Sequence, residues 1–327
     1  MKTRVLTTGT FAGLCLAFAA TSATAAETVL KSGYFISNNK SIFRIAYDGF
    51  TARVNEKGKG AIGISATVGT EAVPSRQMGN AVKSGLLDVA GIPPAYMANL
   101  VKISTSFVGS TKSASEMRRN GAWKVYQDEF AKHANTYLLA QHGGNAEFNI
   151  FTNKPIKSLE DFKGLKLRTS NTYKAFFDAL GARALQMPRR EIFTAMERGV
   201  VDGFANLNSE VLSQGWHEVA KYRIDPGFYH PIIIVGVNLD KWKGMDSKQQ
   251  GVLEEAGIYL EETLSAKMGA DDAAAGKEMV KKGMKVLTLP EADAKKFTEL
   301  AYKSQWDIAE KRDPELGKKL RGLLYGH

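Results

Sequence analysis

The sequence has little cysteine: one, Cys15, in 327 residues. Cys15 falls within residues 1–26, which have the pattern of a secretory signal, and it follows Leu14 where a lipid-anchored precursor has a small residue. The mature chain is therefore predicted to have no thiol, no disulfide and no lipid anchor. Thiol catalysis and cysteine-bound metals are excluded by the same count.

The order of segments in residues 1–26 is typical of a signal peptide. Two basic residues open the chain, residues 11–20 are apolar or small, and small residues fill positions 22–26. The apolar stretch is shorter than the roughly 20 residues that a membrane-spanning helix needs. We expect cleavage after Ala25 or Ala26 and export of the mature chain to the periplasm.

Long hydrophobic runs and clustered basic residues are also missing. No segment after the signal is apolar enough to span a bilayer. The 44 Lys and Arg exceed the 34 Asp and Glu, but the two signs are interleaved, as in Asp161-Phe162-Lys163. Most of these charges are expected to be solvated surface, and no nucleic-acid surface is indicated. An excess of positive charge is compatible with an anionic ligand.

Catalytic and metal-binding motifs are absent from the sequence. The five histidines show no H-x-x-x-H or H-E-x-x-H spacing, and there is no G-x-S-x-G and no P-loop. The glycines of residues 58–63 match G-x-G-x-x-G, but this run follows a helical pattern and opens a strand, the reverse of the dinucleotide-binding context. We predict no enzymatic activity, no cofactor and no metal site. A secreted enzyme with scattered catalytic groups is the alternative.

Short apolar runs alternate with helical patterns, which is typical of an α/β protein. Because a mature chain of about 300 residues exceeds one comfortable core, two lobes are expected. The helical pattern of residues 249–282 is longer than a usual globular helix and suggests a strut along both lobes. We expect strands at 28–32, 61–67, 86–91, 137–141, 147–153, 165–170 and 231–238, and helices at about 42–58 (capped by Asn38 or Asn39), 78–85, 114–134, 172–180, 188–198 and 292–324.

Many spaced positions between residues 154 and 203 form one pattern. They are Lys154-Pro155-Ile156, Leu159 to Phe162, the K-L-R strand within Lys163 to Ser170, Gly181, Gln186-Met187-Pro188, and Glu191 to Gly203. This pattern resembles the signature of the DctP-type receptors of TRAP (tripartite ATP-independent periplasmic) transporters. The run Lys83 to Ala90 fits as well, and a weaker likeness covers the whole mature chain.

The resemblance implies a two-lobe periplasmic binding protein with hinge strands and a long bracing helix. After a signal peptide at residues 1–26, lobe I is expected from 27–145 with about 232–271. Lobe II is expected from 146–231 with about 272–327, which include the C-terminal helices. The resemblance also implies delivery of the ligand to a membrane permease driven by an ion gradient. A receptor for another importer or a sensor system is the second interpretation.

In the family that the chain resembles, the arginine of the K-L-R strand pairs with the ligand carboxylate. Arg168 stands at that position, and a guanidinium fork matches a carboxylate in bidentate geometry. Asn206 keeps the amide that is expected to contact the ligand, although Leu207 replaces the usual proline. Asn208 is a nearby substitute if the loop shifts.

Several departures from the family pattern bear on the ligand. Phe148 occupies the place where a second arginine often lies, and Arg189 is an extra charge that could act as a second clamp. Aromatic side chains replace polar first-lobe contacts, and further cleft residues are expected before the strand at 231–238. The sequence thus predicts that the ligand is a small monocarboxylate, dicarboxylate or sulfonate with an apolar or compact body rather than a sugar acid. The alternative for the aromatic side chains is that they are buried in an ordinary hydrophobic core. The additional candidates are Tyr34, Phe35, Tyr96 with Pro93-Pro94, Tyr229 and His230.

Overall fold

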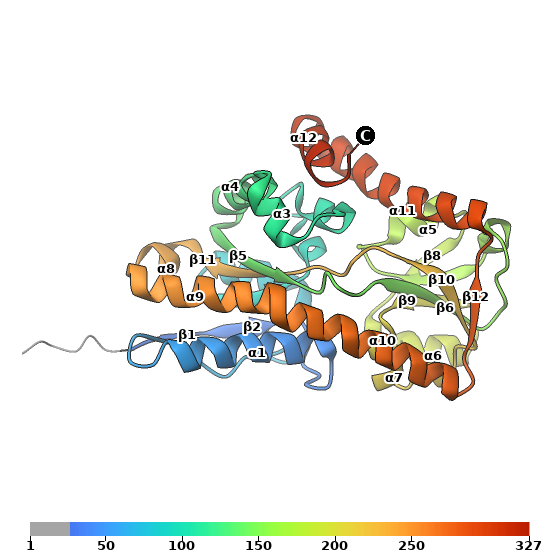
Figure 1. Cartoon of the computed structure of the whole chain (residues 1–327), viewed down its shortest axis with the longest axis horizontal. Coiled ribbons are helices and arrows are strands. Elements are labelled where there is room, and N and C mark those ends of the chain that lie inside the picture. The colour runs from blue at the N-terminus through green and yellow to red at the C-terminus, as the bar shows by residue number, and fades with distance from the viewer. Residues whose placement is uncertain (1–26, 327) are drawn as a thin grey trace, which may run out of the picture.

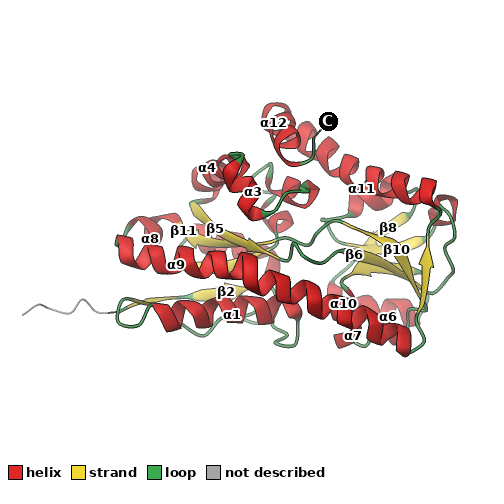
Figure 2. Cartoon of the chain, in the orientation of Figure 1, coloured by secondary structure: helices red, strands yellow, loops and turns green. Residues whose placement is uncertain are grey.

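The computed structural model of the chain describes residues 27–326. The predicted signal peptide and Cys15 lie outside the described residues. The strands gather in two groups along the longest axis of the molecule, and these groups are the sheets of two lobes (Figures 1 and 2). Among residues 27–326, no helix has the length and apolar character required to cross a membrane. The expected two-lobe α/β architecture is confirmed.

Lobe I is built on a four-stranded sheet in the order β2-β4-β11-β5, beside the two-stranded pair β1-β3. β11 is antiparallel to both of its neighbours, and all of its residues are buried, as the continuous apolar run predicted. The bounds are β1 (Thr28–Leu30), β2 (Ser32–Tyr34), β3 (Ile62–Ile64), β4 (Val89–Ile92), β5 (Thr136–His142) and β11 (Ile233–Asn238).

The helices of lobe I cover this sheet. They are α1 (Ile42–Lys57), α2 (Met78–Lys83), α3 (Ala114–Arg119), α4 (Ala122–Ala134) and α8 (Leu239–Lys243). α1 buries Phe43, Tyr47, Phe50 and Val54, whose spacing of three or four places them on one face. Its N-cap is Ser41, not Asn38 or Asn39 as predicted.

The single helix predicted for residues 114–134 is in fact two helices. Gly121 has a φ of 86°, a left-handed conformation that glycine adopts without steric cost. Asn120 precedes it and ends α3, so α4 starts afresh at Ala122. The apolar periodicity continues across the break, which is why the pattern alone predicted one helix.

Lobe II is built on a six-stranded sheet in the order β12-β10-β6-β9-β7-β8. β7, which carries the K-L-R motif, is parallel to its neighbours β8 and β9 and so lies inside the sheet. The strands β8, β9, β10 and β12 were not predicted; in β8, β10 and β12 polar residues interrupt the apolar positions. The bounds are β6 (Phe148–Thr152), β7 (Lys166–Thr169), β8 (Arg183–Gln186), β9 (Gly203–Asn206), β10 (Tyr222–Phe228) and β12 (Lys285–Thr288), with α5 (Lys174–Ala179), α6 (Ile192–Glu197) and α7 (Asn208–Ser213) beside them.

A long helical strut connects the two lobes. It comprises α9 (Ser247–Tyr259), one π-helical turn (Leu260–Leu264) and α10 (Ser265–Lys281). α9 packs on α1 and β5 of lobe I, and α10 packs on α7 of lobe II. Figure 1 shows the strut crossing both groups of strands as one continuous path. Two strand connections, β5 to β6 and β10 to β11, also pass between the lobes.

The C-terminal helices, α11 (Glu291–Arg312) and α12 (Pro314–Leu324), contact both lobes. α11 packs against α5 of lobe II, but its Trp306 is buried in the core of lobe I, where the indole N–H donates to the Gly109 carbonyl at 3.0 Å. Leu320 and Leu324 of α12 join the same core. At 1.5 Å per residue, α11 is about 33 Å long and can reach from one lobe to the other. The prediction had assigned these helices to lobe II alone.

Candidate ligand-binding site

A cavity of about 110 Å³ lies where the two lobes face each other. Residues of both lobes line it, and so do Pro231 and Ile232, which directly precede β11. A wider hollow of about 770 Å³ shares part of this lining. The shared residues are Phe35, Tyr96, Arg168, Ser170 and Arg189, so the two hollows form one interlobe cleft.

Arg168 lies on the lobe II wall of the cleft and is buried, with 6% exposure. Its Nε and Nη2 donate to the Met187 carbonyl at 3.2 and 3.0 Å, and its Nη1 donates to Tyr173 Oη at 2.9 Å. Tyr173 in turn donates to the Ala205 carbonyl at 3.0 Å. A guanidinium has five N–H groups, so one remains on Nη1 and one on Nη2. This is the pair that a carboxylate accepts from in bidentate geometry.

Asn206 also lies on the lobe II wall, at the end of β9. Its Oδ1 accepts from the Leu207 amide at 2.9 Å, and within residues 27–326 its Nδ2 has no hydrogen-bond partner. The side-chain amide can therefore donate into the cavity. Asn208 does not line the cavity: it donates to Asp272 of the strut and accepts from Arg223. Asn206, and not its conditional substitute Asn208, therefore lines the cavity.

Arg189 lines both parts of the cleft, but its charge already has a partner. Its Nη2 donates to Glu210, whose side chain has no solvent exposure. Its guanidinium lies 5.1 Å from the ring centroid of Trp216, a cation–π contact. Arg168, in contrast, forms no ion pair with any carboxylate in the part of the chain that the structure describes.

The lobe I wall is mostly apolar and aromatic. It contains Phe35, Phe43, Pro93, Pro94 and Tyr96. The Phe35 ring meets the rings of Phe43 and Tyr96 edge-on, with centroids 6.2 and 6.4 Å apart. Burial raises the pKa of the Tyr96 hydroxyl, so that group stays protonated and can donate.

One hydroxyl of lobe I interrupts this apolar wall. Thr105 lines the cavity and is 8% exposed, and its buried Oγ1 has no hydrogen-bond partner among the described residues. A buried polar group without a partner costs free energy, so this hydroxyl is suited to a ligand or a water molecule.

The structure brings six of the predicted site residues to the cavity: Arg168, Asn206, Arg189, Phe148, Phe35 and Tyr96. The Phe148 ring lies 5.7 Å from that of Tyr173, where the expected second arginine is missing. The roles of these six residues in ligand binding stay predictions.

Tyr34 and Tyr229 do not line the cavity, which corrects their assignment to the cleft. Tyr34 precedes Phe35 in the chain, and successive side chains of an extended segment point to opposite faces. The Tyr34 hydroxyl donates to the Phe43 carbonyl at 2.9 Å inside lobe I, whereas that of Tyr229 bonds to Ala301 and Ser304 inside lobe II. His230 borders a different hollow and bonds to the Ala146 carbonyl.

The site residues that were not predicted include Phe43, Thr105, Tyr173 and Glu210. Thr105 lies in a 3₁₀ segment with no apolar periodicity, so no pattern marks it. Tyr173 directly precedes α5 and follows the K-L-R strand, a proximity that could have suggested it. Glu210 comes shortly after Asn206, but only the structure reveals its contacts with Ser41 and Ile42, which are distant in sequence.

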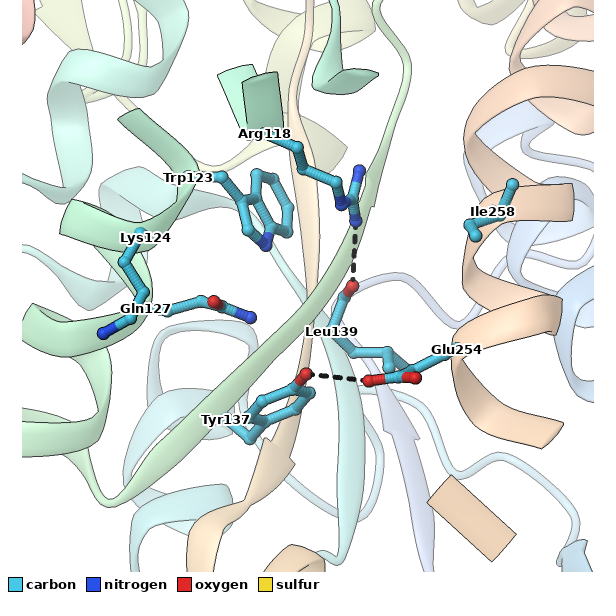
Figure 3. Close-up of a pocket in the computed structure, with 8 residues that line it drawn as sticks. All are labelled: Arg118, Trp123, Lys124, Gln127, Tyr137, Leu139, Glu254 and Ile258. Atoms are coloured by element: carbon cyan, nitrogen blue, oxygen red, sulfur yellow. Dashed lines mark hydrogen bonds between the residues drawn. The ribbon is translucent and has the colours of Figure 1, made fainter. Parts of the chain in front are cut away.

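A separate groove of about 400 Å³ lies within lobe I (Figure 3). Its polar groups already bond to one another or to the backbone: Tyr137 donates to Glu254 at 3.1 Å, and Arg118 donates to the Leu139 carbonyl at 3.2 Å. Arg118 also pairs with Glu261. Because one lobe supplies the whole groove, a movement of the lobes cannot bury a ligand there, and the interlobe cleft is the stronger candidate.

Metal binding has no support in the described part of the chain. Among residues 27–326, no group of three or more His, Cys, Asp or Glu side chains is placed to hold a metal ion. The groups that line the cleft can donate hydrogen bonds, and Arg168 and Arg189 carry positive charge.

Sequence comparison matches residues 33–312 to the family described as "Bacterial extracellular solute-binding protein, family 7". One relative is the 2,3-diketo-L-gulonate-binding periplasmic protein of Escherichia coli, 27% identical over 343 aligned positions that cover 99% of each chain. Another is a monocarboxylate 2-oxoacid-binding periplasmic protein of a Nostoc strain, 24% identical, with 79% of this chain and 72% of that protein covered.

Solved structures show the same fold. A TRAP periplasmic solute-binding protein from Desulfovibrio salexigens with bound orotic acid superposes with a TM-score of 0.78 at 22% identity, covering 90% of this chain and 96% of the other. A Bordetella pertussis receptor that binds pyroglutamic acid has a TM-score of 0.78 at 17% identity, with 90% and 99% covered.

Proposed function

Because the chain belongs to family 7 of the bacterial extracellular solute-binding proteins, we propose that its interlobe cleft captures a small organic carboxylate through Arg168. The chain is a receptor of the TRAP type, and we infer that it delivers this ligand to membrane permease subunits. Export through the signal pattern of residues 1–26 would place it in the periplasm.

The observation that carries this proposal is the state of Arg168. Its guanidinium is buried at the cavity wall, without a carboxylate partner in the described chain, and one N–H on each terminal nitrogen is unused. A buried, unpaired charge is costly, and an anionic ligand removes that cost by forming a charge-assisted pair. The Asn206 amide can donate to the same ligand from the neighbouring strand β9.

Closure of the two lobes would strengthen the ion pair between Arg168 and the ligand carboxylate. Arg168 and Asn206 come from lobe II, whereas Phe35, Phe43 and Tyr96 come from lobe I, so closure of the lobes would remove water from the ion pair. A ligand shifts the equilibrium toward the closed form only by its additional contacts there. The lobe I wall supplies those contacts.

The names of the relatives fit an organic acid as ligand. They bind 2,3-diketo-L-gulonate and monocarboxylate 2-oxoacids, and the structural neighbours hold orotic acid and pyroglutamic acid. All of these proteins are receptors rather than enzymes, and we propose that this chain likewise releases its ligand unchanged.

A thermal-shift screen of the mature protein against small carboxylates and sulfonates tests the proposal. A ligand that binds only the native state stabilises it and so raises the melting temperature. At a hundredfold excess over Kd, the free energy of unfolding increases by about 2.7 kcal/mol. We expect a carboxylate hit that is recovered intact and is lost in Arg168→Ala, because that change removes both free N–H groups. A hit that persists in Arg168→Ala would remove Arg168 from the site, and conversion of the ligand would indicate an enzyme.

A further inference from the structure

Glu210 is a fully buried carboxylate at the point where the two lobes and a cleft arginine meet. It lies on α7 of lobe II, and its side chain has no solvent exposure. Its Oε2 accepts from Arg189 of the cleft. Its Oε1 accepts from the hydroxyl of Ser41 at 2.7 Å and from the amide of Ile42 at 3.0 Å, both at the start of α1 in lobe I.

These contacts hold the Glu210 side chain in place. The first amides of a helix lack partners within the helix and, together with the helix dipole, favour a negative charge. The Arg189 guanidinium supplies the opposite charge from the other side. Both side-chain oxygens of Glu210 thus act as acceptors, and Arg189 has its counter-charge built into the protein.

This pairing sets the charge of the cavity. Among the residues that line it, Arg168 and Arg189 are the only charged ones in the described chain. Glu210 compensates Arg189, which leaves Arg168 as the only cation of this cavity without a carboxylate partner among the described residues. Arg76 and Arg190 line only the wider hollow. A ligand with one negative charge balances this cavity. A second carboxylate held inside the cavity would be desolvated without a partner or would have to displace Glu210 from Arg189.

We propose that the ligand is a monocarboxylate with an apolar body and that Glu210 is the residue that selects against dicarboxylates. This rests on the proposed function, since it concerns the same cleft. Selectivity of this kind arises from a cost imposed on the wrong ligand as well as from contacts to the right one. The apolar body follows from the lobe I wall, where Phe35, Phe43 and Tyr96 offer area but no charge.

Isothermal titration of the mature protein with matched acids tests the inference. Each pair shares a carbon framework and differs by one carboxylate: benzoate with isophthalate, and pentanoate with glutarate, at constant ionic strength. Wild type should bind the monocarboxylate of a pair at least about tenfold more tightly. Glu210→Gln frees the charge of Arg189 and should lower that preference by about tenfold or reverse it.

Two control variants separate charge from structure. Ser41→Ala removes a hydrogen bond to Glu210 but keeps its charge, so the preference within each pair should stay as in wild type. Glu255→Gln removes a carboxylate that pairs with Arg53 on the surface, and it should also leave the preference unchanged. If Ser41→Ala shifts the preference for the monocarboxylate as much as Glu210→Gln does, the role of Glu210 is to bond to the start of α1 across the lobes. The inference is then overturned.

The wild-type titrations decide the matter even if Glu210→Gln does not fold. Tighter binding of the dicarboxylates, with loss of binding in Arg168→Ala, would overturn the inference and leave the proposed function intact. If no acid of either pair binds and the carboxylate screen gives no hit, the proposed function itself fails, and the inference fails with it.

Discussion

The two walls of the cleft differ in chemistry and in how rigidly they are held. Lobe II contributes Arg168 and Asn206 from strands inside a six-stranded sheet, where backbone and side-chain hydrogen bonds fix both. Lobe I contributes rings and prolines from segments that follow its strands, with Thr105 as a hydroxyl among them. This arrangement suggests that lobe II anchors the charge of the ligand and that lobe I recognises its shape.

The anchor should show the largest effect, and Arg168→Lys tests its geometry rather than its charge. Lysine keeps the positive charge but has no planar fork and cannot reproduce the bonds to Met187 and Tyr173. Hydrogen bonds to charged groups contribute about 1.5–3 kcal/mol, so we expect affinity to fall roughly 10- to 100-fold by titration. Arg118→Lys, in the groove of Figure 3, is the matched control and should leave affinity unchanged. An equal loss in both variants would mean that the effect is not local to the cleft.

The lobe II wall could be predicted from the sequence because it lies within one local motif. Arg168, Met187 and Asn206 are close together in the chain, on or beside the adjacent strands β7, β8 and β9, of which the sequence predicted only β7. Lys-Leu-Arg at residues 166–168 and the run ending in Gly203 therefore marked this wall correctly. The lobe I wall is assembled from separate segments, and only the aromatic character of Phe35 and Tyr96 indicated it.

Contacts between distant segments could not be predicted. Glu210 meets Ser41 across 169 positions of sequence, and neither residue belongs to a recognisable motif. Tyr34 and Tyr229 show the converse error: both are near the cleft in sequence, but their side chains are buried in the cores. For Tyr34 the reason is that one step along an extended chain reverses the side-chain direction. Arg189 was correctly placed at the cleft, but its pairing with Glu210 changes what its charge means for the ligand.

The shape-recognising wall should show an intermediate effect, which Tyr96→Ala tests. The ring packs against Phe35 and faces the cavity, so its removal takes away apolar contact area from the closed form. An aromatic contact of this kind contributes about 1.5 kcal/mol, so we expect roughly a tenfold loss of affinity by titration. Tyr96→Phe keeps the ring and should lose much less. If Tyr96→Phe loses as much affinity as Tyr96→Ala, the hydroxyl and not the ring makes the contact with the ligand. The lobe I wall would then recognise the ligand through a polar group.

The smallest effect is expected from Thr105, whose hydroxyl lies on the mostly apolar wall of lobe I. Thr105→Val removes the buried hydroxyl and keeps the shape of the side chain. Because a neutral hydrogen bond contributes about 0.5–1.5 kcal/mol, affinity for a ligand with a hydroxyl or carbonyl group should fall roughly 2- to 12-fold. Ser104→Ala is a close control, because Ser104 Oγ is also buried without a partner in the described chain but does not line the cavity. Neither change should lower the melting temperature of the ligand-free protein, since neither breaks a hydrogen bond seen in the structure. Loss of affinity in Thr105→Val alone would show that lobe I reads one polar group of the ligand as well as its shape. Equal affinities in both variants would remove Thr105 from polar recognition of the ligand.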